Sequence, residues 1–288
     1  MLALLGLVGI ALAGMALVPT NQSDAESGPD PVTPEPEQPL PVLPLDEAIF
    51  GTDDAEEMFS GDRDDQLFGR GGNDYVDGQD GDDTVGGGAG NDDVLGGAGD
   101  DLLAGDDGDD SVFGHIGDDI LSGDAGDDAL NGGNGADRLD GGAGNDALLG
   151  SHGDDMLAGG TGADVMHGGQ GNDRLDGVDY GGIAMRDYLN GGDGDDHLLG
   201  GAFDNLNGGA GSDVFGLTLR LAGTEGAATI DDFDDSVDTI VVYFQGSVPD
   251  MTYEVTDNGV SLFADGAGVA DFPGLTGFDL RTVQLVSA

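Results

Sequence analysis

An aspartate recurs at every ninth residue through the middle of this chain, with glycines at fixed places before it. Blocks of nine read from Gly51 give fourteen consecutive copies that end at Asp176. Position six of the block is Asp in every copy except the first, which has Glu56. Position one is Gly in thirteen copies, position four is Gly in twelve, and position eight is aliphatic or Met in all fourteen. A period kept this strictly indicates a repeated structural unit.

These residue types in this order predict a site for a hard cation. Glycine adopts backbone angles closed to other residues, so glycines at positions one, two and four let carbonyl oxygens turn toward a common point. The aspartate at position six adds a carboxylate to that point. Oxygen ligands in a flexible loop match Ca²⁺, which takes six to eight of them, better than Mg²⁺. We therefore expect multiple calcium ions, with these carboxylates as ligands: Asp65, Asp74, Asp83, Asp92, Asp101, Asp110, Asp119, Asp128, Asp137, Asp146, Asp155, Asp164, Asp173, Asp187, Asp196 and Asp213. The position-four glycines of the same loops are Gly72, Gly81, Gly90, Gly99, Gly108, Gly117, Gly126, Gly135, Gly144, Gly153, Gly162 and Gly171.

The composition narrows the classes of partner. The 288 residues include 59 acidic residues, seven arginines and no lysine, for a formal net charge of -52. Such a field repels nucleic acid and anionic lipid headgroups, whereas it favours cations. The chain has no cysteine, so neither a disulfide nor a thiolate metal site can hold the fold. The stabilising ligands must be oxygens.

Four zones follow one another along the chain. Residues 1–18 form an apolar run that predicts a helix. This helix is interpreted as a signal peptide, as a retained membrane anchor or as a buried core helix. Contact with a membrane is expected only through this segment, if it is retained. Residues 19–50 are rich in Pro and acidic residues and predict a disordered linker. Residues 51–216 carry the repeats, and residues 217–288 are expected to form a β-rich cap.

The repeat also predicts its own secondary structure. The segment around position eight is too short for a helix and has strand character, so position eight should face inward and positions seven and nine outward. After Asp176 an extra segment, Gly177–Gly181, interrupts the period, and four further copies then extend to Gly216. The insertion is interpreted as a surface bulge in one array, with two arrays joined by a hinge as the alternative.

The nine-residue block resembles the G-G-x-G-x-D-x-U-x repeat of RTX (hemolysin-type) calcium-binding proteins. Close copies are GGAGNDDVL at Gly87–Leu95, GGNGADRLD at Gly132–Asp140 and GGQGNDRLD at Gly168–Asp176. The resemblance implies an all-β fold, a right-handed parallel β-roll with two copies per turn and calcium held between loops eighteen residues apart, as in the C-terminal β-roll of serralysin-like proteins. Departures from the pattern at Glu56, Arg63 and Arg70 weaken the first sites. Arg186 and the shortened copy that contains Asp204 put later sites in doubt.

The metal is expected to be a condition of folding. One apolar side chain in nine residues makes a thin core beside the entropy lost when a glycine-rich chain becomes ordered. The carboxylates of neighbouring copies also repel one another unless a cation neutralises them. Calcium binding to the folded state alone would offset both costs.

Strand-like runs follow the repeats at Val214–Leu221, Thr239–Phe244, Thr252–Thr256 and Val260–Ala264, with a hairpin turn at Asp257–Gly259. This region resembles the segment that closes β-rolls in secreted RTX proteins. The resemblance implies that Phe215 caps the apolar column and that Ile230, Phe233 and Ile240 form a small core. It also implies an uncleaved signal for the type I secretion machinery of a Gram-negative bacterium, and therefore an extracellular or cell-surface location.

Candidate catalytic, histidine and docking sites also have simpler explanations. No His-Glu-x-x-His, Gly-x-Ser-x-Gly or cysteine nucleophile occurs in the sequence, and the paired aspartates are explained as repeat positions five and six, so no enzyme activity is expected. Histidines occur at 115, 152, 167 and 197 in four different repeat positions, which is typical of surface loops and not of a metal site. Apolar residues recur at position nine on one expected face, at Phe59, Leu95, Phe113 and Leu149. They are interpreted either as a docking stripe for a partner or the C-terminal segment, or as scattered exposed side chains.

Two classes of function fit these observations. The first is a calcium-loaded, exported structural or interaction module whose folding waits for the calcium outside the cell. The second is a secreted solenoid that binds or modifies carbohydrate. A flat rank of Thr would favour an ice-binding solenoid, but positions seven and nine of the contiguous copies contain only Thr84.

Overall fold

The computed structural model of the protein describes residues 48–180, 184–219 and 226–287. They belong to one unit, Leu45–Ala288. The apolar segment 1–18, for which a helix is predicted, and most of the linker 19–50 lie outside the described residues. Strands make up most of the described chain, together with one short 3₁₀ helix, η1 (Leu280–Thr282). No helix in these ranges is long and apolar enough to cross a membrane.

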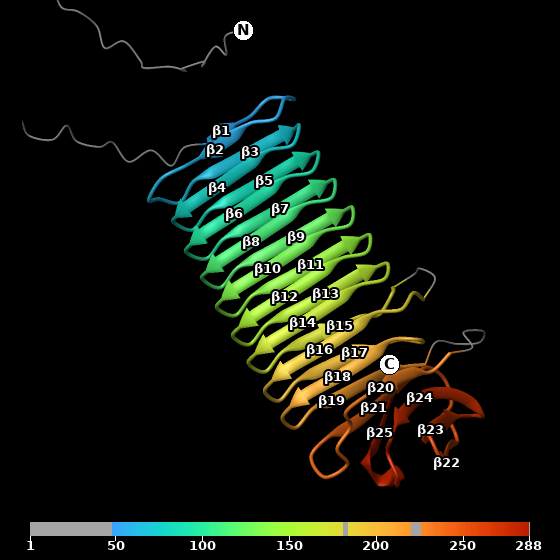
Figure 1. The fold of residues 1–288 in the computed structure, drawn as a ribbon. Helices are drawn as coiled ribbons and strands as arrows, with labels where there is room; N and C mark the ends of the chain where they lie inside the picture. The colour runs from blue at the N-terminus through green and yellow to red at the C-terminus, as the bar shows by residue number, and fades with distance from the viewer. Residues whose placement is uncertain (1–47, 181–183, 220–225, 288) are drawn as a thin grey trace, which may run out of the picture. The chain divides into compact units, whose positions relative to one another are not determined.

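The strands form two parallel stacks that run the length of the roll (Figure 1). Odd-numbered strands build the first sheet: β1 (Ala48–Phe50), β3 (Gln66–Gly71), β5 (Thr84–Ala89), β7 (Leu102–Asp107), β9 (Ile120–Ala125), β11 (Arg138–Ala143), β13 (Met156–Thr161), β15 (Arg174–Asp176), β17 (His197–Gly200), β19 (Val214–Thr218), β21 (Thr239–Phe244) and β25 (Val283–Ser287). Even-numbered strands build the second: β2 (Glu57–Phe59), β4 (Tyr75–Asp80), β6 (Asp93–Ala98), β8 (Ser111–Ile116), β10 (Ala129–Asn134), β12 (Ala147–His152), β14 (Val165–Gln170), β16 (Tyr188–Asp193), β18 (Asn205–Ala210) and β20 (Ala228–Ile230), closed by β24 (Ala267–Pro273), β23 (Gly259–Ala264) and β22 (Met251–Thr256). This arrangement confirms the predicted parallel β-roll.

Most strands of the roll are longer than the three residues around position eight that the sequence predicts. A typical strand such as β8 contains positions seven to nine of one copy and positions one to three of the next. Positions four to six, the Gly-x-Asp segment, form the loop between the two sheets. Two copies therefore complete one turn, and Leu130 pairs with Val112 on one side and Leu148 on the other, each eighteen residues away. Position eight is buried in every strand, as predicted, and lines a single apolar column.

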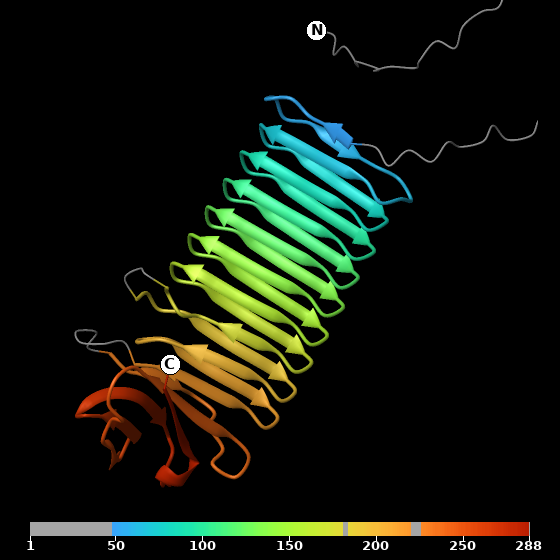
Figure 2. The same ribbon diagram turned by 180° about the vertical axis from the view of Figure 1, so that it is seen from behind.

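The inserted segment is accommodated without interrupting either sheet. Leu189 in β16 pairs with Met166 in β14, and Leu198 in β17 pairs with Leu175 in β15, with the offset between partners increased to 23 residues. The strands on both sides of this step stay in the same two stacks (Figure 2). The insertion is therefore a bulge in one continuous array, and the two-array alternative is wrong.

Buried apolar side chains of the cap close the C-terminal end of the roll. Strands β22, β23 and β24 form an antiparallel meander, and β24 joins β20 in parallel, so the second sheet continues into the cap. The predicted hairpin turn between β22 and β23 is confirmed. Phe215, Ile230, Phe233 and Ile240 are buried together, as expected.

The cap contains more than the sequence predicts. Strands β20, β24 and β25 and the side chains of Phe272 and Phe278 were not anticipated. Ring centroids lie 6.1 Å apart for Phe215 and Phe233, and 5.3 Å apart for Phe233 and Phe272. The cap therefore has an aromatic core, whereas the column inside the roll consists of aliphatic and Met side chains.

Candidate metal centre

The position-six aspartates form two hydrogen-bonded ladders, one along each row of loops. The backbone N–H of Asp83 donates to Oδ1 of Asp101, eighteen residues on, at 2.8 Å, and Asp101 donates to Asp119 in turn at 2.9 Å. One ladder begins at the N–H of Glu56 and passes through Asp74, Asp92, Asp110, Asp128, Asp146, Asp164 and Asp187. The other passes from Asp65 through Asp83, Asp101, Asp119, Asp137, Asp155, Asp173, Asp196 and Asp213. All sixteen predicted carboxylate residues are buried.

The second carboxylate oxygen is the notable feature of most of these loops. Within the described ranges, Oδ2 is buried and lacks a hydrogen-bond partner in twelve aspartates: Asp74, Asp83, Asp92, Asp101, Asp110, Asp119, Asp128, Asp137, Asp146, Asp155, Asp173 and Asp196. A buried acceptor with no donor is costly, and far more so when it carries charge. The other four predicted aspartates, Asp65, Asp164, Asp187 and Asp213, lie near the first turn, the insertion and the cap.

Position-four glycines bring carbonyl oxygens into the gap between successive loops. All twelve predicted ones have φ between 108° and 146°, in the region that favours glycine. A methyl group on Gly108 would overlap the carbonyl oxygen of Gly90, so that oxygen points toward the next loop. The Asp110 carboxylate reaches back into the same gap to accept from Asp92. Carbonyl and carboxylate oxygens therefore occupy the space between each pair of loops.

Position-one glycines are needed for a different reason from the predicted one. No position-one glycine in the described copies has a φ in the left-handed region. A methyl group on Gly114 would instead overlap Oδ2 of Asp119, and it would lie 2.7 Å from the carbonyl oxygen of Gly132. The expectation of special backbone angles is wrong at this position. Glycine is required there because the carboxylate takes up the space of a side chain.

Position-five side chains make a second ladder that runs in the opposite direction. Oδ1 of Asp100 accepts from the N–H of Asp118 at 2.9 Å, whereas position-six carboxylates accept from the preceding turn. Residues at this position are exposed to solvent. The two carboxylates of one loop therefore point away from each other. Across the described residues, no group of three or more His, Asp or Glu side chains converges on one point.

Burial of the position-six row changes its protonation. Desolvation is the largest cause and raises the pKa of Asp101, Asp146 and Asp155 to about 7, and neighbouring position-six carboxylates add to the effect. The backbone N–H that each group accepts opposes the shift. The pKa of Asp187 rises to about 8, again first by desolvation and then by the charges of Asp204, Asp164 and Asp179. Without a cation, these loops resist carrying their full negative charge.

Sequence reasoning missed the residues that end the two ladders. Asp204 accepts from the N–H of Asp187 at 3.1 Å, and Asp238 accepts from that of Asp213 at 3.0 Å. Their Oδ2 atoms have protein donors as well, the N–H groups of Gly201 at 2.6 Å and Asp234 at 2.8 Å. These partners are 17 and 25 residues apart, so a search at a period of eighteen does not find them.

The histidines also lie apart from the loops that carry the ladders. His115, His152 and His167 lie in the second sheet, and His197 lies in the first. Desolvation, followed by the charge of Arg174, lowers the pKa of His197. They line surface hollows and take no part in the carboxylate ladders.

Fold and site together define a parallel β-roll whose loops stack buried, oxygen-rich gaps suited to hard cations. The chain belongs to the RTX calcium-binding nonapeptide repeat family, which matches residues 50–85, 86–121, 113–148, 149–178 and 186–206, more than half of the chain. Membership of this family implies that the repeats bind calcium.

Comparison with other proteins adds little beyond the family. The crystal structure of the extracellular lipase LipA from Serratia marcescens is similar at 17% sequence identity with a TM-score of 0.24, over 80% of this chain and 40% of the lipase chain. This chain thus corresponds to less than half of that lipase. No curated protein matches the chain at a significant level.

Proposed function

We propose that the protein is an exported structural or interaction module that folds around several calcium ions. The observation that carries this proposal is the set of twelve buried Oδ2 atoms that, among the described residues, have no protein donor. Each lies against the position-one glycine of its own copy, as Oδ2 of Asp119 lies against Gly114, and carbonyl oxygens of position-four glycines lie between the same loops. Carboxylate and carbonyl oxygens are the donor atoms that Ca²⁺ prefers. The donor set therefore fits this ion.

The residues that would hold calcium are the position-six aspartates and the position-four glycines of successive loops. Asp101, Asp119 and Asp137 contribute carboxylates on one row, and Gly99, Gly117 and Gly135 contribute carbonyl oxygens. Bound calcium would supply the positive charge that this row lacks. The protein supplies the fixed geometry, because each Oδ1 is already anchored by a backbone N–H and only Oδ2 remains for the ion.

Calcium would stabilise only the folded chain, because the unfolded chain does not bring these loops together. One site contributes about 1.4 to 2.7 kcal/mol when free calcium is about ten to a hundred times its dissociation constant. Several sites of this size match the scale on which small folded domains are stable. Metal binding and folding are then one equilibrium.

Export follows from the same equilibrium in this proposal. The chain would stay unfolded where calcium is scarce and fold after it leaves the cell, at the cell surface or in the medium of a Gram-negative bacterium. Residues 217–288 would serve both as the cap of the roll and as the signal for type I secretion, with residues 1–18 as signal or anchor. The linker would be residues 19–47, because the last three residues of the expected linker 19–50 form β1 and pair with β3. The carboxylates are accounted for by metal loops, so we assign the module no catalytic role.

A calcium titration of the purified full chain tests the proposal. Far-ultraviolet circular dichroism should report little β structure in dialysed, metal-free protein and a cooperative gain as calcium reaches the millimolar range. A chelator should reverse the gain, and the same concentration of magnesium should not produce it, because Mg²⁺ demands a tighter octahedral geometry. Identical spectra with and without calcium would rule the proposal out.

A further inference from the structure

The outward face of the second sheet differs from the rest of this acidic molecule. We define the neutral face as the outward side chains of β8, β10, β12, β14, β16 and β18, six strands in succession along the roll (Figure 1). These strands contain one acidic residue, Asp193, and no arginine. In a chain with 59 acidic residues, so nearly uncharged an area requires an explanation.

Register places uncharged hydrogen-bonding groups in rows across this face. The position-nine residues pair from strand to strand in the order Phe113, Asn131, Leu149, His167, Asn190 and Asn207. Position three adds Asn134, His152 and Gln170 in a parallel row. The side-chain amides of Asn190 and Asn207 make no hydrogen bond to any other described residue. Each amide offers both donors and an acceptor to a ligand.

Three shallow hollows follow one another along these rows. The first, of about 290 Å³, lies between Phe113, His115 and His152. The second, of about 610 Å³, is lined by His152, His167, Gln170 and Asn207 together with Asp193. The third, of about 460 Å³, is lined by Tyr188, Asn190 and Asn205 together with Asp231. Because neighbouring hollows share lining residues, they form one groove across the strands.

Aromatic rings lie at both ends of this groove. Tyr188 is 47% exposed beside the third hollow. At the other end, the rings of Phe113 and His115 are stacked with centroids 6.0 Å apart. An exposed ring with amides beside it offers one apolar surface and several hydrogen bonds, which suits a ligand with C–H faces and many hydroxyl groups.

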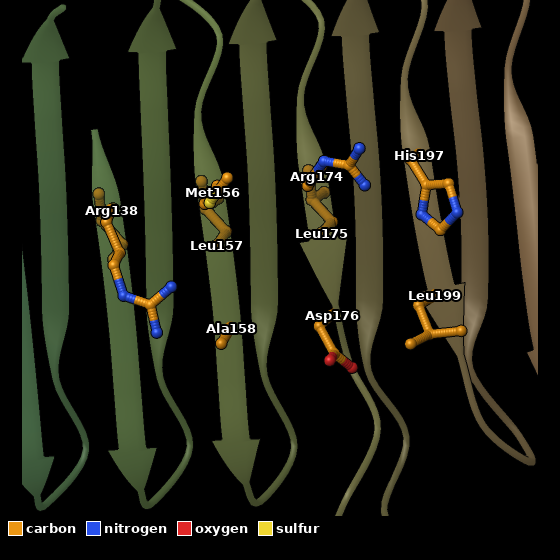
Figure 3. Close-up of a pocket in the computed structure, with 10 residues that line it drawn as sticks. Arg138, Met156, Leu157, Ala158, Arg174, Leu175, Asp176, His197 and Leu199 are labelled. Atoms are coloured by element: carbon orange, nitrogen blue, oxygen red, sulfur yellow. The ribbon is translucent and has the colours of Figure 1, made fainter. Parts of the chain in front are cut away.

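The corresponding groove on the first sheet is charged and provides the contrast. It is lined by Arg138, Arg174, Asp176 and His197 around Met156 (Figure 3). Strands β7, β9 and β11 of that sheet also present Asp106, Asp107, Asp124 and Asp140. A charged ligand would find both cationic and anionic partners on that face, whereas the hollows of the neutral face offer only the carboxylates of Asp193 and Asp231.

We infer that the neutral face binds a linear neutral polysaccharide. An anionic polymer is disfavoured because the loops on both sides of the face are acidic. A protein partner is less well matched, since of the Trp, Tyr and Arg residues that dominate protein interfaces the six strands contain only Tyr188, and their one Met, Met166, is buried. Neutral sugar hydroxyls match the amide, imidazole and hydroxyl groups in rows, and the groove runs across several strands, as an extended chain requires. The inference goes beyond calcium-dependent folding but needs the folded roll.

Binding of calcium-loaded full-length protein to cello-oligosaccharides, laminarin, mannan and dextran tests the inference, with polygalacturonate as the anionic probe. Isothermal titration calorimetry should detect at least one neutral glycan and no polygalacturonate. Tyr188→Ala should weaken that binding about tenfold, and the Asn190→Ala/Asn207→Ala pair by a similar or larger factor. Phe59→Ala is the matched control, since Phe59 is 50% exposed on the same sheet outside the groove, and it should bind as the parent does.

Circular dichroism of each calorimetry sample separates this test from that of the proposed function. If the samples are folded and none of the neutral glycans binds, the inference is overturned while calcium-dependent folding stands. Equal binding by Tyr188→Ala, Asn190→Ala/Asn207→Ala and Phe59→Ala, or preference for polygalacturonate, would also overturn it. Sedimentation velocity on the same samples detects a second copy as the occupant. Self-association abolished by Tyr188→Ala would likewise overturn the assignment to a glycan.

Discussion

The roll and its C-terminal cap solve the same stability problem with different interactions. In the roll, each copy buries one aliphatic side chain and one carboxylate, and Oδ2 of Asp119 has no protein donor among the described residues. Next to the cap, Asp204 in a late copy of the roll and Asp238 just before β21 end the ladders with backbone donors on both oxygens. Four phenylalanines, Phe215, Phe233, Phe272 and Phe278, pack there as well.

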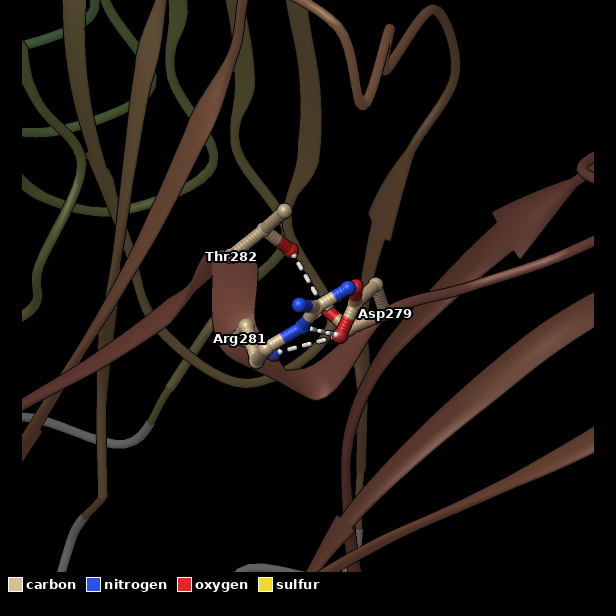
Figure 4. Close-up of polar contacts among 3 residues, drawn as sticks. All are labelled: Asp279, Arg281 and Thr282. Atoms are coloured by element: carbon tan, nitrogen blue, oxygen red, sulfur yellow. Dashed lines mark hydrogen bonds and ion pairs between the residues drawn. The ribbon is translucent and has the colours of Figure 1, made fainter.

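An exposed ion pair in the cap sharpens the contrast. The Asp279 carboxylate accepts from the backbone N–H and side chain of Arg281 at the start of η1, while Thr282 Oγ1 donates to the Asp279 carbonyl oxygen at 2.8 Å (Figure 4). The side-chain hydrogen bond from Arg281 lowers the pKa of Asp279 to about 2. Burial in the roll raises the pKa of aspartates that lack a cationic neighbour. At this one carboxylate of the cap the counter-charge comes from the chain, whereas the twelve buried aspartates of the roll whose Oδ2 lacks a donor form no ion pair among the described residues.

Truncating the Phe215 ring, which lies where the roll meets the cap, should have the largest effect among single substitutions. Phe215→Ala removes a fully buried ring at the junction of roll and cap, and we expect a loss of about 3 to 5 kcal/mol in the free energy of unfolding. Denaturant unfolding at saturating calcium measures it. Phe59→Ala, at an exposed position, should change the unfolding free energy by less than about 0.5 kcal/mol. A Phe215→Ala chain as stable as the parent would show that the cap does not support the roll.

A methyl group added between loops should destabilise the roll next most strongly. Gly126 has φ of 142°, and a Cβ there would overlap the carbonyl oxygen of Gly108. We expect Gly126→Ala to cost at least about 1 to 3 kcal/mol, from backbone strain and the displaced carbonyl.

The control for this substitution is Gly61→Ala, where a Cβ would meet no atom within 4 Å. Thermal unfolding in calcium compares the two variants. Equal melting temperatures would mean that the loops are looser than the stacked arrangement requires.

Removing one interior carboxylate should act through calcium affinity. Asp119→Asn keeps an acceptor for the N–H of Asp101 but removes the charge, so the midpoint of the calcium titration should rise several-fold. Asp118→Asn alters an exposed position-five carboxylate in the same loop and should shift the midpoint much less. A larger shift for Asp118→Asn would show that the ion binds the position-five carboxylates and not the position-six carboxylates.

The smallest expected effect is that of pH on the metal-free roll. Burial raises the folded-state pKa of Asp101 and Asp155 to about 7, above the value of about 3.9 expected in the unfolded chain. The folded chain then binds more protons, so its stability is greatest below about pH 4 and falls as the pH rises to about 7.

Dialysed, calcium-free protein should therefore show more β structure at pH 4.5 than at pH 7.5 by circular dichroism. With calcium present the trend should reverse, because protons compete with the ion. Spectra that do not change with pH in the absence of calcium would show that the position-six row is not desolvated.

How far the sequence predicted the structure depends on the region. The period of nine predicted strand segments with position eight inward and the loops that contain the position-six carboxylates, because one residue pattern repeated many times places equivalent residues in equivalent positions. The parallel pairing was implied by the resemblance to the RTX repeat. The sequence predicted fewer of the strands and contacts of the cap. Strands β24 and β25 and the contacts of Phe272 and Phe278 depend on pairings between segments with no common period.

By itself, then, the sequence determined the repeated strand-and-loop unit and the oxygen chemistry of its loops, since those follow from local patterns repeated many times. Its resemblance to the RTX repeat implied the parallel roll and the turn of two copies. Only the tertiary structure decided which oxygen of each carboxylate is left without a donor, and that position-one glycines make room for that oxygen. The tertiary structure also continues the ladders to Asp204 and Asp238, although these partners depart from the spacing of eighteen residues. It aligns the neutral side chains of six strands on one face. Those features depend on what lies one turn away in space, about eighteen residues away in the chain.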